Sequence, residues 1–127
     1  MTFLEIFADD RGTLGSIEFN NLPFAPKRFY WIVMSNEEVR GRHAHRTLDQ
    51  IIFVQEGVIE FKIISGNSQS SRVLRQGEYI HLGPAIWREF KCLTKSGVLG
   101  CLASEAYDES DYVRDFDAFS ELNNEVL

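Results

Sequence analysis

The feature that most constrains the fold is a succession of short segments, rich in Val, Ile, Phe, Tyr and Trp, that turn-forming residues separate. In one segment Glu60 and Lys62 alternate with Ile59, Phe61 and Ile63, so successive side chains point to opposite faces of a strand. Short strands with one buried face are typical of all-β sandwiches and barrels. The predicted strands are residues 3–7, 14–19, 27–34, 41–46, 50–55, 57–64, 71–75, 78–82, 86–91 and 97–104.

The sequence changes character after Ser104. Tyr112, Phe116 and Phe119 follow one another at steps of four and three, in a stretch whose acidic residues suit a helix start. This spacing predicts a short C-terminal helix or helical turn whose aromatic side docks on the sheet.

The length of 127 residues predicts one domain, residues 1–127. No segment approaches the roughly 20 apolar residues of a membrane helix, and the N-terminus lacks the basic start and apolar stretch of a secretory signal. We therefore expect a cytoplasmic protein without a membrane partner. In that reducing compartment Cys92 and Cys101 are expected to be thiols that serve packing.

The charge distribution argues for a small anionic ligand. The net charge of −6 disfavours DNA or RNA as a partner, because a polyanion would be repelled. Against this acidic background Arg28, Arg40, Arg42 and Arg46 lie close together in the sequence. Such a cluster suits a phosphate ester, although a solvated arginine face would give the same pattern.

His43 and His45 are the first candidates for chemistry. They lie two apart in a predicted strand, so both should project to the same side. Taken alone, two histidines on one strand face are as compatible with inert polar residues of the core or surface as with a functional pair.

The surrounding segment resembles the first cupin motif, with His43 and His45 in the histidine positions, Gln50 where the acidic ligand stands and Gly57 at the end. The second cupin motif is matched more loosely by residues 77–88. Cupins usually hold a metal with three histidines and a glutamate. Here Gln50 is neutral, and Arg88 in the fourth corner would place a positive charge in the metal's volume. We therefore expect no tightly bound metal and no cofactor.

A narrower resemblance extends over nearly the whole chain. The blocks DDRGTLGSIE, LPFAPKRFYWI, RGRHAHRTLDQ, LGPAIWREF and LASEAYDESDYVRDFDAF together resemble the WxcM-like cupins, the dTDP-4-dehydro-6-deoxyglucose 3,4-ketoisomerases of deoxysugar biosynthesis. The resemblance implies a cupin double-stranded β-helix, or jelly roll, that forms a metal-free cytoplasmic homodimer. Its substrate would be a dTDP-linked 4-keto-6-deoxy sugar and its product a dTDP-3-dehydro-6-deoxyhexose.

The implied reaction moves a carbonyl group from C4 to C3 and needs proton transfer near neutral pH. His43 and His45 are predicted to divide the proton steps, because the ordinary pKa of histidine, about 6.5, lies nearest that range. Arg88 and Arg40 are candidates for stabilising the enediolate intermediate, and Arg40 or Arg28 for holding the pyrophosphate. Which histidine acts on which carbon does not follow from the sequence.

Aromatic side chains are expected to frame the sugar and the thymine, with Trp87 as first choice and Tyr30 and Tyr107 behind it. Trp87 and Arg88 face opposite sides of a regular strand, so both line the cavity only if the strand is bulged or twisted. The predicted substrate-binding set is Arg11, Arg28, Tyr30, Arg40, Gln50, Trp87, Arg88 and Tyr107.

The family resemblance implies that the residues at the positions of Arg11 and Arg88 differ between enzymes that give the galacto product and enzymes that give the gluco product. This chain has arginine at both, which matches neither subgroup fully, and the Arg11-Gly12 block favours the galacto product.

Three other functions compete with this interpretation. They are a dTDP-sugar 3,5-epimerase, a nucleotide-sugar-binding cupin without catalysis, and a metal-dependent cupin oxygenase. A binding module has no need of two adjacent titratable groups, and an oxygenase requires a metal.

Overall fold

The computed structural model describes residues 3–126, which form β-strands, two short 3₁₀ turns and one α-helix. The strands are β1 (Leu4–Asp9), β2 (Gly12–Ile17), β3 (Arg28–Ser35), β4 (Val39–His45), β5 (Gln50–Glu56), β6 (Val58–Ser65), β7 (Ser68–Arg75), β8 (Tyr79–Leu82), β9 (Ile86–Cys92), β10 (Ser96–Ala103) and β11 (Tyr112–Val113). The turns are η1 (Phe19–Asn21) and η2 (Glu109–Asp111), and the helix is α1 (Phe116–Val126). Among these residues no helix has the length and apolarity that a bilayer crossing requires.

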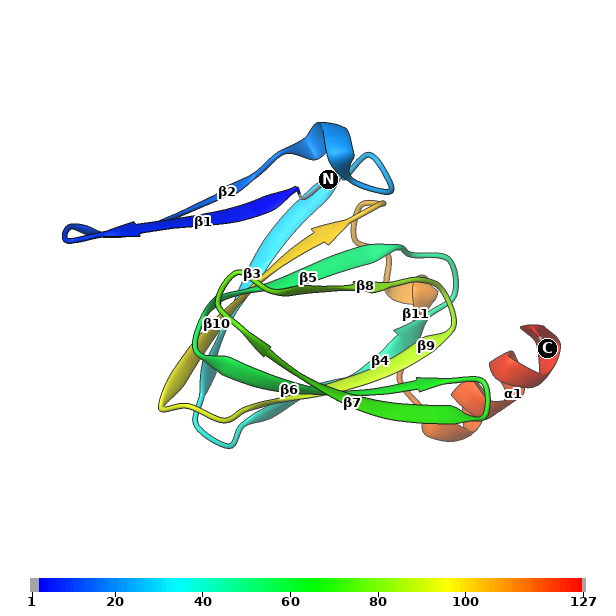
Figure 1. The fold of residues 1–127 in the computed structure, drawn as a ribbon. Coiled ribbons are helices and arrows are strands. Elements are labelled where there is room, and N and C mark those ends of the chain that lie inside the picture. The colour runs from blue at the N-terminus through cyan, green and yellow to red at the C-terminus, as the bar shows by residue number, and fades with distance from the viewer. Residues whose placement is uncertain (1–2, 127) are drawn as a thin grey trace.

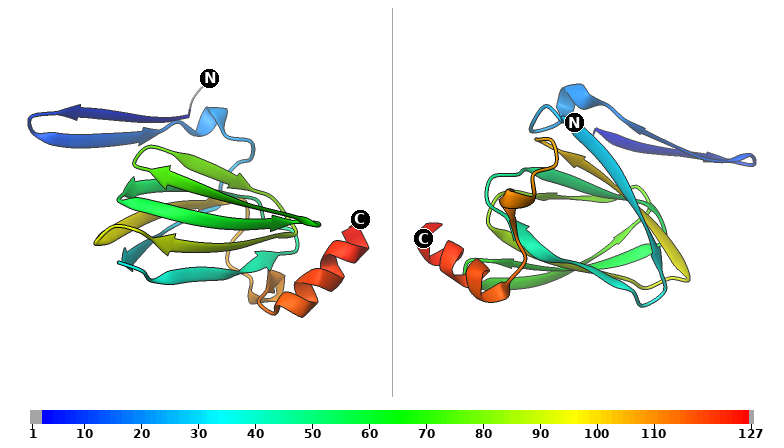
Figure 2. Two further views of the ribbon diagram at one scale, coloured as in Figure 1. Left: turned by 60° about the horizontal axis from the view of Figure 1, so that its bottom comes forward. Right: turned by 180° about the vertical axis from the view of Figure 1, so that it is seen from behind.

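Two antiparallel sheets face each other and form the body of the molecule (Figure 1). One has the strand order β3-β10-β5-β8 and the other β11-β4-β9-β6-β7. The hairpin β1–β2 forms a separate two-stranded sheet that extends away from this body, while α1 lies at the opposite end (Figure 2). The predicted all-β jelly roll with a short C-terminal helix is confirmed.

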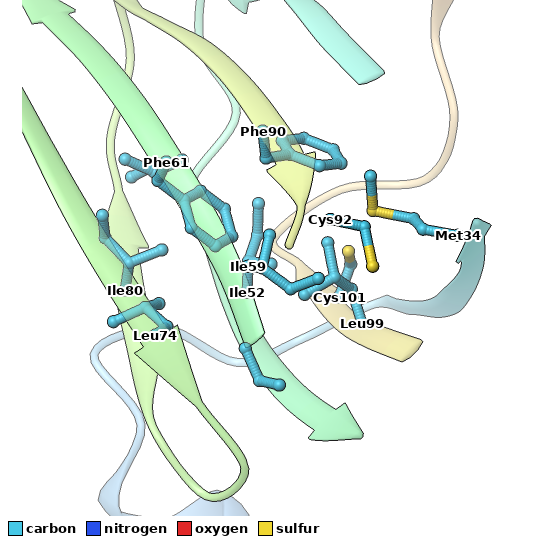
Figure 3. Packing of buried hydrophobic residues seen from close by; sticks show 12 residues of the cluster. Met34, Ile52, Ile59, Phe61, Leu74, Ile80, Phe90, Cys92, Leu99 and Cys101 are labelled. Atoms are coloured by element: carbon cyan, nitrogen blue, oxygen red, sulfur yellow. The ribbon is translucent and has the colours of Figure 1, made fainter. Parts of the chain in front are cut away.

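The main core lies between the two sheets, because alternate residues of every long strand point inward. Ile59 and Phe61 of β6, predicted from their alternation to face inward, are completely buried in this cluster. Cys92 and Cys101 are buried there as free thiols, near Met34 at one end of the cluster (Figure 3). Burial of this apolar surface is the main force that holds the sheets together.

Each sheet also has an apolar cluster on its outer face. On the four-stranded sheet, Ile51, Phe53 and Leu102 pack against Phe3 and Leu4 of the N-terminal segment. On the five-stranded sheet, a second outer cluster joins β4, β9, β11 and α1, and its buried members are Ala44, Trp87, Val113 and Phe119. The molecule is therefore layered as hairpin, sheet, sheet and helix.

The predicted strands all occur, with ends shifted by up to three residues. The polar segment 65–69 contains a two-residue turn, Gly66-Asn67, whose flanking residues Ser65 and Ser68 already pair. One prediction is wrong: Tyr112 does not belong to the helix. It pairs with His45 in the short strand β11, and α1 begins only at Phe116. Phe119 nevertheless docks on the sheet as predicted.

Gly100 offers a test of the outer cluster on the four-stranded sheet. The Phe53 ring from β5 lies across Gly100 of β10, and a Cβ atom there would be 2.2 Å from the tip of the ring. We expect Gly100→Ala to lower the free energy of unfolding in urea by about 1–3 kcal/mol, because Phe53 must leave its position.

Gly83→Ala is the matched control. An added Cβ would meet only a carboxylate oxygen of Asp49, at 3.6 Å. Its free energy of unfolding should stay within about 0.5 kcal/mol of the parent. Equal stability of the two variants would contradict the packing described for Phe53.

Candidate active site

Strand β4 brings His43 and His45 to one side, as their spacing predicts. Ala44 between them points outward into the cluster under α1. The two imidazole rings meet edge to face, with their centroids 4.9 Å apart. A bulge before His43 shifts the pairing with β9, and Arg42 there has a φ of 58°, the left-handed region. The bulge allows His43 to pair with Arg88 of β9.

Arg88 and Gln50 connect the two sheets beside the histidines. The Arg88 guanidinium is buried, with Nη1 donating to Gln50 Oε1 at 2.6 Å and Nε donating to the Ile86 carbonyl at 3.2 Å. Gln50 Nε2 in turn donates to the Tyr30 hydroxyl at 2.6 Å. This orientation of the amide is required, because a guanidinium can only donate.

Arg88 has no counter-ion among residues 3–123, whose side chains the structure describes. No carboxylate of these residues acts on its charge, and its Nη2 is buried without a partner. Burial lowers the pKa of Arg88 to about 10, which still leaves it charged at neutral pH. A buried, unpaired charge opposes folding and is typical of functional sites.

The residues at this site do not fit a metal ion. Among the residues that the structure describes, no three His, Cys, Asp or Glu side chains come together as a ligand set. Next to the two histidines stand a neutral amide, already bonded through its oxygen, and the Arg88 cation. A divalent cation would meet like charge and lack the oxygen ligand of Gln50.

The hydrogen-bond partners fix the tautomer of His43. Its Nδ1 lies 3.0 Å from the Gly41 carbonyl, which only accepts, so Nδ1 carries the proton and Nε2 carries the lone pair. Burial, and secondly the charge of Arg88, lowers the pKa of His43 to about 4. The same two causes lower the pKa of His45. Both rings are therefore neutral at pH 7 and able to accept a proton.

Two adjoining cavities contain most of the predicted site residues. The first, of about 340 Å³, is lined by Tyr30, Arg40, His43, Gln50 and Arg88. The second, of about 370 Å³, is lined by Arg28, His45 and Tyr107. Tyr112 lines both.

The two arginines predicted to hold the pyrophosphate, Arg28 and Arg40, differ in their surroundings. The Arg28 guanidinium lies over the Tyr30 ring at 4.9 Å and over the Tyr107 ring at 5.6 Å, and its Nε is buried without a hydrogen-bond partner. Arg40 is half exposed and lies 3.7 Å from a carboxylate oxygen of Glu38. Arg28 is thus the more desolvated of the two cations.

Two predicted substrate-binding residues lie elsewhere. Trp87 points to the outer face of β9, packs on Phe116 and Phe119, and donates through Nε1 to Glu89. The pairing of β9 with β6 is regular, so Trp87 and Arg88 face opposite sides and the assignment of Trp87 to the cavity is wrong. Arg11 lies at the exposed tip of the β1–β2 hairpin, paired with Asp9, and lines neither cavity.

The sequence argument overlooked Asp111 and Tyr112. The Tyr112 ring lies 5.0 Å from the His43 ring and 4.3 Å from the His45 ring, and Asp111 lies against His45. Both residues belong to the YDESDY segment already quoted for the family resemblance. Tyr112 is spaced from Phe116 as in a helix, and this spacing did not indicate that Asp111 and Tyr112 belong to the site.

Known proteins that are similar to this chain include sugar 3,4-ketoisomerases. The TDP-4-oxo-6-deoxy-α-D-glucose-3,4-oxoisomerase of Aneurinibacillus thermoaerophilus is 39% identical over 114 residues, which cover 87% of this chain and 82% of that protein. Of the solved structures, the sugar 3,4-ketoisomerase QdtA of Thermoanaerobacterium thermosaccharolyticum, in complex with TDP, superposes with a TM-score of 0.88 at 31% identity, covering 98% of this chain and 93% of that one. The TDP-quinovose 3,4-ketoisomerase WlaRB of Campylobacter jejuni gives a TM-score of 0.81 at 31% identity, covering 94% of each chain.

The family model described as FdtA, WxcM-like, C-terminal, matches residues 1–124. This match and the similarity to ketoisomerases confirm the resemblance found in the motifs, and with it the prediction of an isomerase with a cupin-like fold. The chain belongs to the FdtA family of WxcM-like proteins.

Proposed function

We propose that this chain moves the keto group of dTDP-4-dehydro-6-deoxy-D-glucose from C4 to C3, without metal or cofactor. The observation that carries the proposal is the pair of neutral histidines beside a buried arginine that lacks a counter-ion. One relative named above is a TDP-4-oxo-6-deoxy-α-D-glucose-3,4-oxoisomerase and another is a sugar 3,4-ketoisomerase solved with TDP, which supports the same substrate class.

The reaction is an isomerisation in which protons move and the atom count does not change. The C4 ketone acidifies the hydrogen on C3, and a neutral imidazole Nε2 takes it, which leaves an enolate. The hydroxyl proton on O3 passes to O4, giving an enediolate with its charge on O3. Return of a proton to C4 then completes the C3 ketone. His43 and His45 divide these steps, because both accept protons and their rings touch.

Arg88 stabilises the negative charge that develops on the sugar oxygens. Its guanidinium is already in place and largely free of water, so little reorganisation is needed when the charge forms. Gln50 holds this cation through a neutral oxygen. A glutamate in that position would pair with Arg88 and cancel the charge that the enediolate requires.

The nucleotide is proposed to lie toward the second cavity. Arg28 has an unpaired, buried Nε between the Tyr30 and Tyr107 rings, which suits a pyrophosphate oxygen. The Tyr107 ring contacts Arg28 and Tyr112 but is 59% exposed, and its exposed part suits stacking on a base. Arg40 lines the first cavity and is assigned to the sugar or its phosphate.

The deciding experiment is incubation of the substrate with the protein in deuterated water, followed by NMR. We expect a new 3-keto signal and deuterium at C4, because the carbonyl moves and C4 receives its proton at the site. Exchange at C3 and C5 without carbonyl movement would indicate a 3,5-epimerase, and no exchange a binding protein. His43→Asn and His45→Asn are the controls, and each should convert the sugar far more slowly than the parent protein, with only a small residual rate.

The same reaction run in ordinary water, which keeps H4 in the product, reports the configuration at C4, which we propose to be galacto because of the Arg11-Gly12 block. In the galacto product H4 is equatorial, so its coupling to the axial H5 is small. A large diaxial coupling would instead identify the gluco product, the configuration of quinovose.

The pH dependence follows from the lowered pKa of His43. Because its pKa is about 4 rather than the ordinary value of about 6.5, the base form persists to lower pH. We expect kcat/KM to stay constant from neutral pH down to about 5 and to fall as the pH drops through about 4. A fall of kcat/KM that is centred near pH 6.5 would contradict this environment of His43.

In Arg88→Gln, an NMR titration should show a higher His43 pKa, because a nearby positive charge has been removed.

We further propose that a second copy of the chain covers the outer face of β3. Phe29, Trp31 and Val33 alternate along this edge strand and are all about half exposed or more, at 49%, 64% and 64%. Phe7 and Leu14 of the extended hairpin are exposed as well. An apolar stripe on an open sheet edge is typical of a protein interface, and a homodimer also removes the edge.

Sedimentation tests this homodimer. Val33→Glu places a charge in the stripe and is expected to shift the protein from dimer to monomer at micromolar concentration. Val73→Glu alters another exposed apolar residue, on β7 of the other sheet, and should leave the dimer intact. Monomeric parent protein would refute the proposed interface.

The cytoplasm is the proposed location. Cys92 and Cys101 are buried free thiols rather than a disulfide, which is consistent with a reducing compartment.

A further inference from the structure

We propose that Asp111 is the positioning residue of His45: its carboxylate holds the proton of the ring on Nδ1 and so makes Nε2 the atom that accepts a proton from the substrate. The inference rests on the proposed function for its catalytic meaning. It assigns a role to a residue that the reaction scheme above does not use.

The Asp111 carboxylate is held from three directions. Oδ1 accepts from the Thr47 amide at 2.9 Å and from the Thr47 hydroxyl at 2.8 Å, and Oδ2 accepts from the Leu48 amide at 3.2 Å. The donors all come from the segment that directly follows β4. The carboxylate is therefore fixed relative to the strand that carries both histidines, and its side chain is only 14% exposed.

The backbone around Asp111 is anchored as well. The Arg46 amide donates to the Asp111 carbonyl at 2.9 Å, and the next residue, Tyr112, pairs with His45 in β11. Arg114 donates two hydrogen bonds, of 2.8 and 2.9 Å, to the carboxylate of Glu109, the first residue of the η2 turn. Because hydrogen bonds hold η2 at both ends, the turn is preorganised to keep the His45 ring in place.

The same Oδ2 atom of Asp111 also faces the ring of His45. Oδ2 lies 3.3 Å from His45 Nδ1, and the ring is almost completely buried. This contact is longer than an ordinary N–H···O hydrogen bond of about 2.9 Å, and it is an ion-pair contact rather than a hydrogen bond, since Nδ1 and Nε2 of His45 are both buried without a hydrogen-bond partner. Because a carboxylate accepts and a neutral imidazole has one N–H, the contact favours the proton on Nδ1. When Nε2 takes a proton, opposite charges then face each other and the contact strengthens.

A comparison with His43 shows what the Asp111 carboxylate adds at His45. The same tautomer is held there by the neutral Gly41 carbonyl, which supplies orientation without a full negative charge. The two histidines thus present the same nitrogen for proton transfer, but among the described side chains a carboxylate lies in ion-pair range of His45 and none in that range of His43. Asp111 does not take the proton; it orients the ring and stabilises the imidazolium for the interval in which His45 holds it.

The test is the tautomeric state of the histidines, measured by long-range ¹H–¹⁵N NMR on the full chain without substrate. The sequence has three histidines, so the spectrum is simple. In the parent protein we expect His45 to carry its proton on Nδ1. In Asp111→Asn the amide group can donate to Nδ1, and the proton should move to Nε2. We expect kcat to fall by about 100-fold or more while KM changes by less than about 3-fold, as for loss of a general base.

Two controls separate positioning from a general loss of stability. Asp49→Asn breaks the other aspartate–histidine contact, between Asp49 and His81 at the surface, where the distance is 2.8 Å. It should alter only the His81 signals and leave kcat within about 2-fold. In a His45→Asn background, Asp111→Asn should change kcat by less than about 2-fold, because Asp111 acts through His45.

An Nε2-protonated His45 in the parent protein would refute the proposal, and that measurement requires no variant. Unchanged kcat in a folded Asp111→Asn protein would refute it too. The tautomer is read without substrate, so a parent protein that has the expected tautomer but does not move the keto group would refute the proposed function instead.

Discussion

The hydrogen bond between Arg88 and Gln50 is the contact on which the rest of the site depends. It spans the two sheets at the point where a positive charge is buried without a negative partner. Because Gln50 is neutral, the charge stays unbalanced, and it adds to burial, the larger cause, in lowering the pKa of His43 and His45. One cation thereby disfavours a metal, helps to keep two imidazoles neutral and prepares the cavity for an anion. The large apolar core between the sheets offsets the free energy that its burial requires.

The periodicity of the sequence was sufficient to predict the strands and the relative direction of neighbouring side chains. It placed His43 and His45 on one face and Trp87 and Arg88 on opposite faces, and both relations hold. It did not reveal which face of β9 points inward, since that depends on how the two sheets pack. Trp87 was therefore assigned to the cavity, although it belongs to the cluster beneath α1.

The contacts that sequence reasoning missed are those between distant segments. Thr47 and Asp111 are 64 positions apart, and nothing in the local pattern of either segment indicates that they meet. Tyr112 was misplaced for a related reason. Its spacing from Phe116 and Phe119 fits a helix, but pairing with β4 outweighs that local preference and draws the residue into a strand. Tertiary contacts, rather than propensity, decide where this aromatic side chain lies.

The position of Asp111 and Tyr112 in the chain has a consequence for how the protein is made. Strand β4, with both histidines, leaves the ribosome early, whereas β11 and the η2 turn come near the C-terminus. Until that last segment folds back onto β4, His45 lacks both its carboxylate neighbour and the ring that covers it. A nascent or truncated chain can thus possess the histidine pair and most of the barrel without a finished site. Competence for proton transfer would appear only after the segment with η2 and β11 has been made and has docked on β4.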